Sequence, residues 1–332
     1  MQHPEDDRPH AKVGNVYTQP HSVKAPAHVG QVFLPWSDLD VAVGAPEEEL
    51  PGLWNAQANL QAPEGGSFVQ VGTKFHTPRP LTAVAATLST KVDVVLRADG
   101  KDYPLSGSDR PLLDPNQPNE DDNYWVAVEG HPKDIEVRVS FAGQTQVVSA
   151  DGSVARGRTA DGERAPTYEK VRAFKHVPCS TPRAVGSSPL QIGYPDELAC
   201  LVTLVSRTPY VDGLGWAEPG REFLLVEVKM PFSISVHSAD QPREHYWEKK
   251  HHTLSATLGG EPTAADPIHA DALPLGITRN QGGNQFVFEV VRGKPAGEFR
   301  LTDKLRATLS DPFDPRTADL TIAWTVPARK LA

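Results

Sequence analysis

The chain has 332 residues, 31 of them proline and 26 glycine, and a formal net charge of −9 with a pI near 5.7. An acidic chain without a basic stripe is poorly suited to bind nucleic acid, because neutralised phosphates supply most of that affinity. No apolar stretch reaches the roughly 18 residues needed to span a bilayer. We therefore expect neither a nucleic-acid partner nor a transmembrane segment.

Residues 1–31 contain several histidines and prolines but almost no large apolar side chain, which predicts a mobile tail. They also lack the apolar core of a signal peptide. The protein therefore works in the cytoplasm, or its export segment or membrane anchor lies outside this sequence. A metal-binding tract is the alternative for the tail, but the irregular spacing of its histidines gives no chelate geometry. These histidines are His3, His10, His21 and His28.

A first β-sandwich is predicted over residues 32–149. Its clearest strand is Phe68–Phe75, and short alternating runs follow at residues 92–96, 124–128 and 135–141. Clusters of Gly, Pro, Asn and Asp separate these runs, and long helical periodicity is nearly absent. This pattern is typical of an all-β sandwich or barrel.

An acidic excursion over residues 106–123 interrupts the first sandwich. Asp114 and Asp121 are candidate ligands for a hard cation such as calcium, together with neighbouring carboxylate and amide oxygens. Two prolines break any EF-hand register, and the glycine of its sharp turn is absent. The sequence therefore favours a solvated acidic loop over a calcium site.

Residues 150–166 are rich in Gly, Asp and Arg and predict a linker to a second sandwich over residues 167–328. The only cysteines, Cys179 and Cys200, lie before and inside a predicted strand of that sandwich. A disulfide between them would fasten the intervening loop to the sheet and would imply an oxidising compartment. Two buried thiols are the alternative.

The densest apolar run of the chain is Arg221–Met230. Pro219-Gly220 before it and Pro231 after it bound the run, and its β-branched content favours a strand over a helix. Because side chains alternate along a strand, the even-numbered face from Leu224 to Val228 is predicted to be buried.

Three matches between the two halves, in the same order, predict a duplicated domain. Phe68 matches Phe223 at an offset of 155 positions, and the hairpin turns that follow match at 160. The third match, at about 163, aligns Trp125–Pro132 with Val287–Pro295. Small loop insertions would produce this slow drift of the offset.

Histidines and tryptophans are the remaining candidates for chemistry or binding. His237, His245, His251 and His252 could gather around a transition metal or act in acid–base chemistry. A solvated strand edge guarded by neighbouring lysines is the favoured interpretation, since His251 and His252 would point to opposite faces of a strand. Exposed tryptophans would instead suit a carbohydrate-binding module. The candidates are Trp54, Trp216 and Trp247, with Trp125 more suited to the core.

The strand Gly220-Arg221-Glu222-Phe223-Leu224-Leu225-Val226-Glu227-Val228, with the hairpin and strand pair after it, resembles a known family. It is similar to the telokin-like immunoglobulin-type domain of unknown function in secreted proteins and lipoproteins of Gram-positive, often actinobacterial, organisms. That family shows a Gly-x-x-Phe-x-x-Val-x-Val strand that is often followed by an Asn. This chain lacks that Asn and has Pro231 near the same point. The likeness covers residues 196–327 and, more faintly, 60–148. It implies a β-sandwich outside the cytoplasm behind an N-terminal anchor, and it transfers no catalytic residue.

The sequence therefore predicts an all-β protein of two tandem immunoglobulin-like antiparallel sandwiches. It contains no Gly-x-Ser-x-Gly elbow, P-loop, His-Glu-x-x-His or dinucleotide fingerprint, so we expect no enzyme and no cofactor. The leading hypothesis is an extracytoplasmic protein that binds a protein or cell-envelope partner through exposed loops. A carbohydrate-binding or accessory module and a metal-dependent protein that uses the histidines of residues 237–252 remain as alternatives.

Overall fold

The computed structural model is built almost entirely of β-strands, and its one described helix is the short α2 (Ala328–Leu331). No helix in the part of the chain that the model describes is long and apolar enough to cross a membrane. The described residues are 9–19, 28–34, 38–50, 60–76, 92–105, 121–156, 177–192, 200–211, 213–230, 236–238, 247–266, 283–309 and 317–331.

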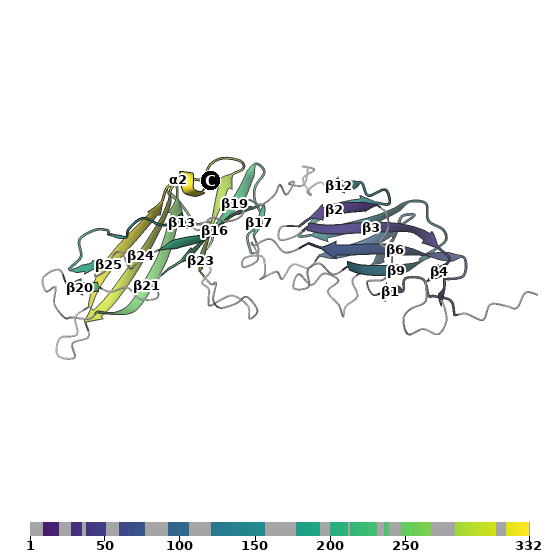
Figure 1. The fold of residues 1–332 in the computed structure, drawn as a ribbon, viewed down its shortest axis with the longest axis horizontal. Helices are drawn as coiled ribbons and strands as arrows, with labels where there is room; N and C mark the ends of the chain where they lie inside the picture. The colour runs from purple at the N-terminus through teal and green to yellow at the C-terminus, as the bar shows by residue number, and fades with distance from the viewer. Residues whose placement is uncertain are drawn as a thin grey trace, which may run out of the picture. The chain divides into compact units, whose positions relative to one another are not determined.

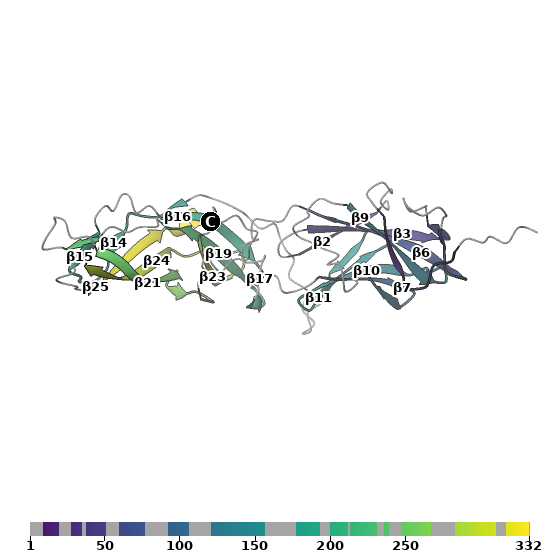
Figure 2. The same ribbon diagram turned by 90° about the horizontal axis from the view of Figure 1, so that it is seen from below.

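The described residues form two compact units, one up to Arg156 and the other from Val177 onward (Figures 1 and 2). Each unit contains two main antiparallel sheets. This confirms the prediction of an all-β, sandwich-like architecture.

The first unit has two five-stranded sheets and a small hairpin. The first sheet contains, in spatial order, β1 (Val16–Gln19), β9 (Asp121–Glu129), β6 (Gly66–Phe75), β3 (Asp38–Glu47) and β2 (Val29–Phe33). The second contains β12 (Val154–Arg156), β11 (Gln144–Ser149), β10 (Ile135–Phe141), β7 (Asp93–Ala98) and β8 (Lys101–Pro104). The hairpin pairs β4 (Glu49–Leu50) with β5 (Leu60–Gln61).

The second unit has a four-stranded and a five-stranded sheet, with two small strand pairs. The first sheet contains β13 (Val177–Pro178), β16 (Leu201–Thr208), β19 (Arg221–Lys229) and β23 (Asn284–Val291). The second contains β14 (Arg183–Ala184), β25 (Thr317–Val326), β24 (Phe299–Leu309), β21 (Trp247–Leu258) and β22 (Glu261–Pro262). The small pairs are β15 (Leu190–Ile192) with β20 (Val236–Ser238) and β17 (Tyr210–Val211) with β18 (Gly215–Trp216).

The core of the second unit lies between its two main sheets. Leu224, Val226 and Val228 of β19 are fully buried and belong to one apolar cluster with Trp324 of β25. The even-numbered face of β19 is thus the core face, as its alternation predicts. Phe223 and Leu225 on the opposite face are also only 5% and 3% exposed, so β19 is buried on both faces.

An apolar cluster lies on the outer face of the first sheet of the first unit. Phe68 of β6 and Trp125 of β9 are almost completely buried there. Residues from outside the sheet cover them, namely Ala11, Leu50 and Ala62. Both faces of β6 are therefore buried, which agrees with its continuous apolar and small-residue sequence.

The two units pair their central strands in corresponding registers. Phe68 of β6 lies opposite Ala127 of β9, and Phe223 of β19 lies opposite Glu289 of β23. Ala127 and Glu289 are therefore equivalent, and so are Trp125 and Val287, which lie two residues earlier on the same strands. The sequence alignment of the two halves gives the same match. The two hairpin turns also agree, since Ala98–Lys101 and Leu258–Glu261 both close over two residues with positive φ.

Residues 9–19 form what we call the strap, and they lie within the predicted tail. The strap contributes β1 to the first sheet, and the segment at Val29 begins β2. The tail prediction is wrong for these residues because backbone pairing and the small side chain of Ala11 suffice to seat a segment poor in apolar residues. The linker prediction is also wrong for β12, which pairs with β11.

Candidate binding surface and disulfide

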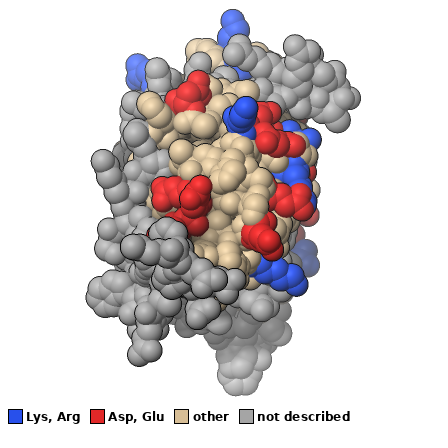
Figure 3. Space-filling view, turned by 90° about the vertical axis from the view of Figure 1, so that its right-hand side faces the viewer, with Lys and Arg blue, Asp and Glu red and all other residues tan. Residues whose placement is uncertain are grey.

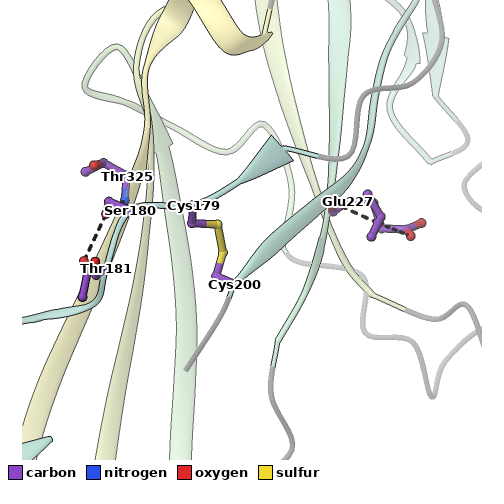
Figure 4. Close-up of a disulfide and its surroundings, with 7 residues drawn as sticks. Cys179, Ser180, Thr181, Cys200, Glu227 and Thr325 are labelled. Atoms are coloured by element: carbon purple, nitrogen blue, oxygen red, sulfur yellow. Dashed lines mark hydrogen bonds between the residues drawn. A yellow bond between two sulfur atoms is a disulfide. The ribbon is translucent and has the colours of Figure 1, made fainter. Parts of the chain in front are cut away.

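The predicted disulfide between Cys179 and Cys200 is present (Figure 4). Their Cα atoms are 5.3 Å apart, and the amide of Cys179 donates to the carbonyl of Cys200 over 3.0 Å. Cys200 is 2% exposed and belongs to the core of the second unit. The bond therefore clamps the segment that follows β13 onto the start of β16.

The disulfide takes the place that an apolar pair has in the first unit. Aligning the β2–β3 register with that of β13–β16 sets Cys179 against Val32 and Cys200 against Leu39. Val32 and Leu39 lie directly opposite each other, and both are fully buried. A covalent bond thus replaces a hydrophobic contact at the corresponding edge.

The clamped segment also joins the two main sheets of the second unit. The amide of Ser180 donates to the carbonyl of Thr325 on β25 over 2.8 Å, and the amide of Thr325 donates to Ser180 Oγ over 3.0 Å. In the first unit the side chain of Gln146 on β11 makes the analogous link. It donates to the carbonyl of Phe33 over 2.7 Å and accepts from its amide over 3.2 Å.

Apolar side chains are exposed at one end of the second unit, which we call the hairpin end and define as residues 210–211, 213–220 and 291–294. Tyr210 and Trp216 lie opposite each other in the β17–β18 hairpin, and their rings make an edge contact at 5.1 Å. Tyr210 is buried and Trp216 is half-buried, while Leu214 at the tip is 38% exposed. Val291, at the end of β23, is 50% exposed.

Next to the hairpin end, a network of hydrogen bonds made by two charged side chains links neighbouring strands. Arg207 Nη1 donates to Glu222 Oε1, and Arg207 Nη2 donates to the carbonyl of Lys294 over 2.6 Å. Glu222 Oε1 also accepts from the amide of Gly293 over 3.2 Å. The network joins β16, β19 and the turn after β23, so it gives the hairpin end a rigid base.

We expect Arg207→Met to lower the free energy of unfolding of the second unit by about 1–3 kcal/mol, because it leaves the partly buried Glu222 without its cation. Urea unfolding monitored by fluorescence measures the change. Arg306→Met is the matched control, since the Arg306–Asp319 pair has exposed side chains (63% and 67%) and should cause no measurable shift. Equal shifts for the two variants would contradict a structural role for the Arg207 network.

Surface ion pairs shift the pKa values of two side chains further away from neutral pH. The hydrogen bond from Arg306 holds the pKa of Asp319 below its ordinary value. The hydrogen bond to Glu129 raises the pKa of Lys101. Both shifts disfavour proton transfer near neutral pH, so these groups are poor candidates for acid–base catalysis.

Among the other sequence candidates, the structure describes Asp121, His251 and Trp247 by their backbone positions only. Asp121 lies in β9 opposite Lys74, and His251 lies in β21 opposite Arg306, in different units. Trp247 begins β21, and its side chain is outside the described part, as are those of Asp121 and His251. Trp54, Asp114 and His245 lie outside the described residues altogether. Within the described residues no group of three His, Cys, Asp or Glu side chains is placed to hold a metal ion.

Two polar features of the second unit, one buried and one partly buried, were not predicted. Asp303 is 1% exposed on the core face of β24, between Leu254 and Ile322 of the neighbouring strands. On the outer face, Glu227 accepts from Thr203 over 2.7 Å and from Gln285 over 2.9 Å. The alternation of β24 contained the signal for Asp303, because this residue falls in phase with Leu301 and Leu305.

Charged side chains on the face shown in Figure 3 lie singly or in small groups around a neutral surface, with acidic and basic groups interspersed. A comparison with protein families finds no match for this chain, and a search of curated proteins finds none either.

Proposed function

We propose that the protein is a non-enzymatic extracytoplasmic binding protein of the Gram-positive cell envelope, built from two immunoglobulin-like domains. The strand order supports the fold assignment. If β3, β6, β7, β8, β9, β10 and β11 are named A, B, C, C′, E, F and G, the sheets read A-B-E and C′-C-F-G once the additional edge strands β1, β2 and β12 are set aside. The constant-type immunoglobulin order is A-B-E-D with C-F-G, so among these seven strands the difference is which sheet carries the fourth strand.

The second unit supports a domain duplication by the same strand order. Its strands β16, β19, β21, β22, β23, β24 and β25 take the positions A, B, C, C′, E, F and G in turn. Even the small hairpins agree, since Leu50 pairs with Leu60 and Val211 with Gly215 at corresponding places after strand A. The resemblance to the telokin-like family is in keeping with this arrangement.

The disulfide is the observation that carries the extracytoplasmic assignment. Disulfides persist in oxidising compartments and are rare in the reducing cytoplasm. Cys179 and Cys200 are bonded at a site where the first unit uses an apolar pair, so the sandwich does not need sulfur there for packing. An oxidising environment explains the use of cysteine at this position.

Binding to envelope material tests the proposed function. The purified, oxidised protein should co-sediment with isolated Gram-positive cell envelopes, saturate with concentration and be displaced by unlabelled protein. Leu214→Asp should weaken this binding, because it charges the exposed tip of the hairpin end. Co-sedimentation no greater than that of an unrelated acidic β-sandwich would contradict the proposal.

Carbohydrate binding is the second candidate function, and the half-buried Trp216 in edge contact with Tyr210 favours it. Aromatic side chains that expose part of a ring suit the apolar faces of sugars. Under this alternative, cell-wall oligosaccharides should change the tryptophan fluorescence of the protein, and Trp216→Ala should abolish the change. Trp324→Phe is the control, since Trp324 is buried and should not respond. An unchanged response in Trp216→Ala would exclude Trp216 as the sugar-binding side chain.

A further inference from the structure

The strap closes an edge of the first unit through contacts that a separate peptide could also make. The amide of Ala11 donates to the carbonyl of Gln61 over 2.8 Å, and the amide of Gly14 donates to the carbonyl of Ala127 over 2.8 Å. The amide of Ala127 donates in turn to the carbonyl of Asn15 over 3.0 Å, and β1 continues the pairing along β9. Most of these contacts are backbone hydrogen bonds, as in β-strand addition.

Side chains of the strap add a small apolar anchor. Ala11 is 6% exposed in the cluster with Phe68 and Trp125, and the Tyr17 ring makes an edge contact with the Phe68 ring at 6.0 Å. Without the strap, Phe68 would lose part of its cover, with Leu50 and Ala62 remaining, and the edge of β9 would lose its partner strand. The first unit therefore has a slot for an extended segment.

The second unit closes the corresponding edge with residues of its own. The side chain of Arg221 donates to the carbonyl of Glu289 over 3.1 Å, and the amide of Ala264 donates to the carbonyl of Val287 over 2.7 Å. Gly66 holds the position of Arg221 in the first unit, and a Cβ there would collide with the carbonyl of Val128. The first unit therefore has no side chain at this position that could cover the edge of β9. An added strand must pair with that edge instead.

The connection of the strap to its own unit is unusual for consecutive strands. β1 and β2 lie on opposite edges of the same sheet, with β9, β6 and β3 between them. Consecutive strands more often lie next to each other. Four strand spacings make about 19 Å, whereas the nine residues 20–28 can span about 30 Å when extended. The connection is long enough to seat the strap on its own sheet and also long enough to release it.

We propose that the strap exchanges between two copies of the chain. Residues 9–19 of each copy fill the slot beside β9 of the other, which gives a symmetric dimer with an isologous interface. The occupant is a second copy because its strap already has the sequence that fits the slot. Local opening of a four-residue strand at a sheet edge is the low-cost step that permits the exchange.

Cross-linking of two single-cysteine variants tests the exchange. Val16 and Val126 lie directly opposite each other in the β1–β9 pairing, and the described chain has no free cysteine. Val16→Cys and Val126→Cys proteins, mixed and incubated at high concentration under mild oxidation, should form a covalent species of twice the 36.1 kDa chain mass. The matched control is Val16→Cys mixed with Phe288→Cys, because Phe288 holds the corresponding position on the guarded strand β23. We expect at least tenfold less cross-linked product from the control pair.

Light scattering of the unmodified protein provides a second readout that does not depend on variants. A mass that rises from one chain to two with concentration, and returns to one chain on addition of excess synthetic peptide of residues 9–19, supports the exchange. A single-chain mass at all concentrations without cross-linked product would overturn it. A dimer that resists the peptide and does not cross-link would also overturn it, because the interface would then lie elsewhere.

Discussion

Replacing Trp324 with alanine should lower the free energy of unfolding of the second unit by about 3–5 kcal/mol. Trp324 is 1% exposed and packs in the cluster that joins both main sheets, so the truncation opens a large cavity in the core. A change of this size should shift the urea midpoint of that unit by more than about 1 M.

Trp216→Ala is the matched control for Trp324→Ala. Both substitutions remove an indole ring from the same unit, but Trp216 is half-buried in the small hairpin and lies outside the described core cluster. We expect the control to cost about 1 kcal/mol or less. Comparable losses for the two variants would contradict the assignment of Trp324 to the core.

Removing the disulfide should have the second large effect on stability. Cys179→Ala combined with Cys200→Ala should lower the free energy of unfolding by about 2–4 kcal/mol, because the bond closes a loop of 21 residues in the unfolded chain. Dithiothreitol should destabilise the natural protein and leave this variant unaffected. Thermal unfolding with and without the reductant measures both effects.

The first unit suggests a sharper version of this experiment. Cys179→Val combined with Cys200→Leu installs the residues that hold the corresponding positions there. This variant should recover part of the stability lost by the double alanine variant, since the apolar pair refills the space beside the core. Equal stability of the two double variants would show that the two edges do not pack alike.

Strong alternation and clear boundaries explain why most core strands were predictable. The runs at Arg221–Met230 and residues 135–141 combine β-branched side chains with turn residues at both ends, and both are strands in the structure. The disulfide was predictable for a related reason, because the chain has only two cysteines and one precedes a recognisable strand.

The strap and β3 were harder to predict because backbone pairing, more than side-chain pattern, defines them. β1 contributes only four residues to the first sheet, and Ala11 is too small to produce a hydrophobic signal. β3 carries Gly44 and Pro46 near a register shift, and both residues normally indicate a turn. The hairpin end was equally hidden, since nothing in the sequence placed Tyr210 against Trp216 before the pairing of β17 with β18 was known.

Thiol trapping in intact cells tests the central proposal that this protein functions outside the cytoplasm. Cells are quenched in acid, free thiols are alkylated, and the peptides that contain Cys179 and Cys200 are analysed by mass spectrometry before and after reduction. The proposed compartment predicts that the two cysteines are recovered as one disulfide-linked pair of peptides. Recovery of both as alkylated free thiols would contradict it.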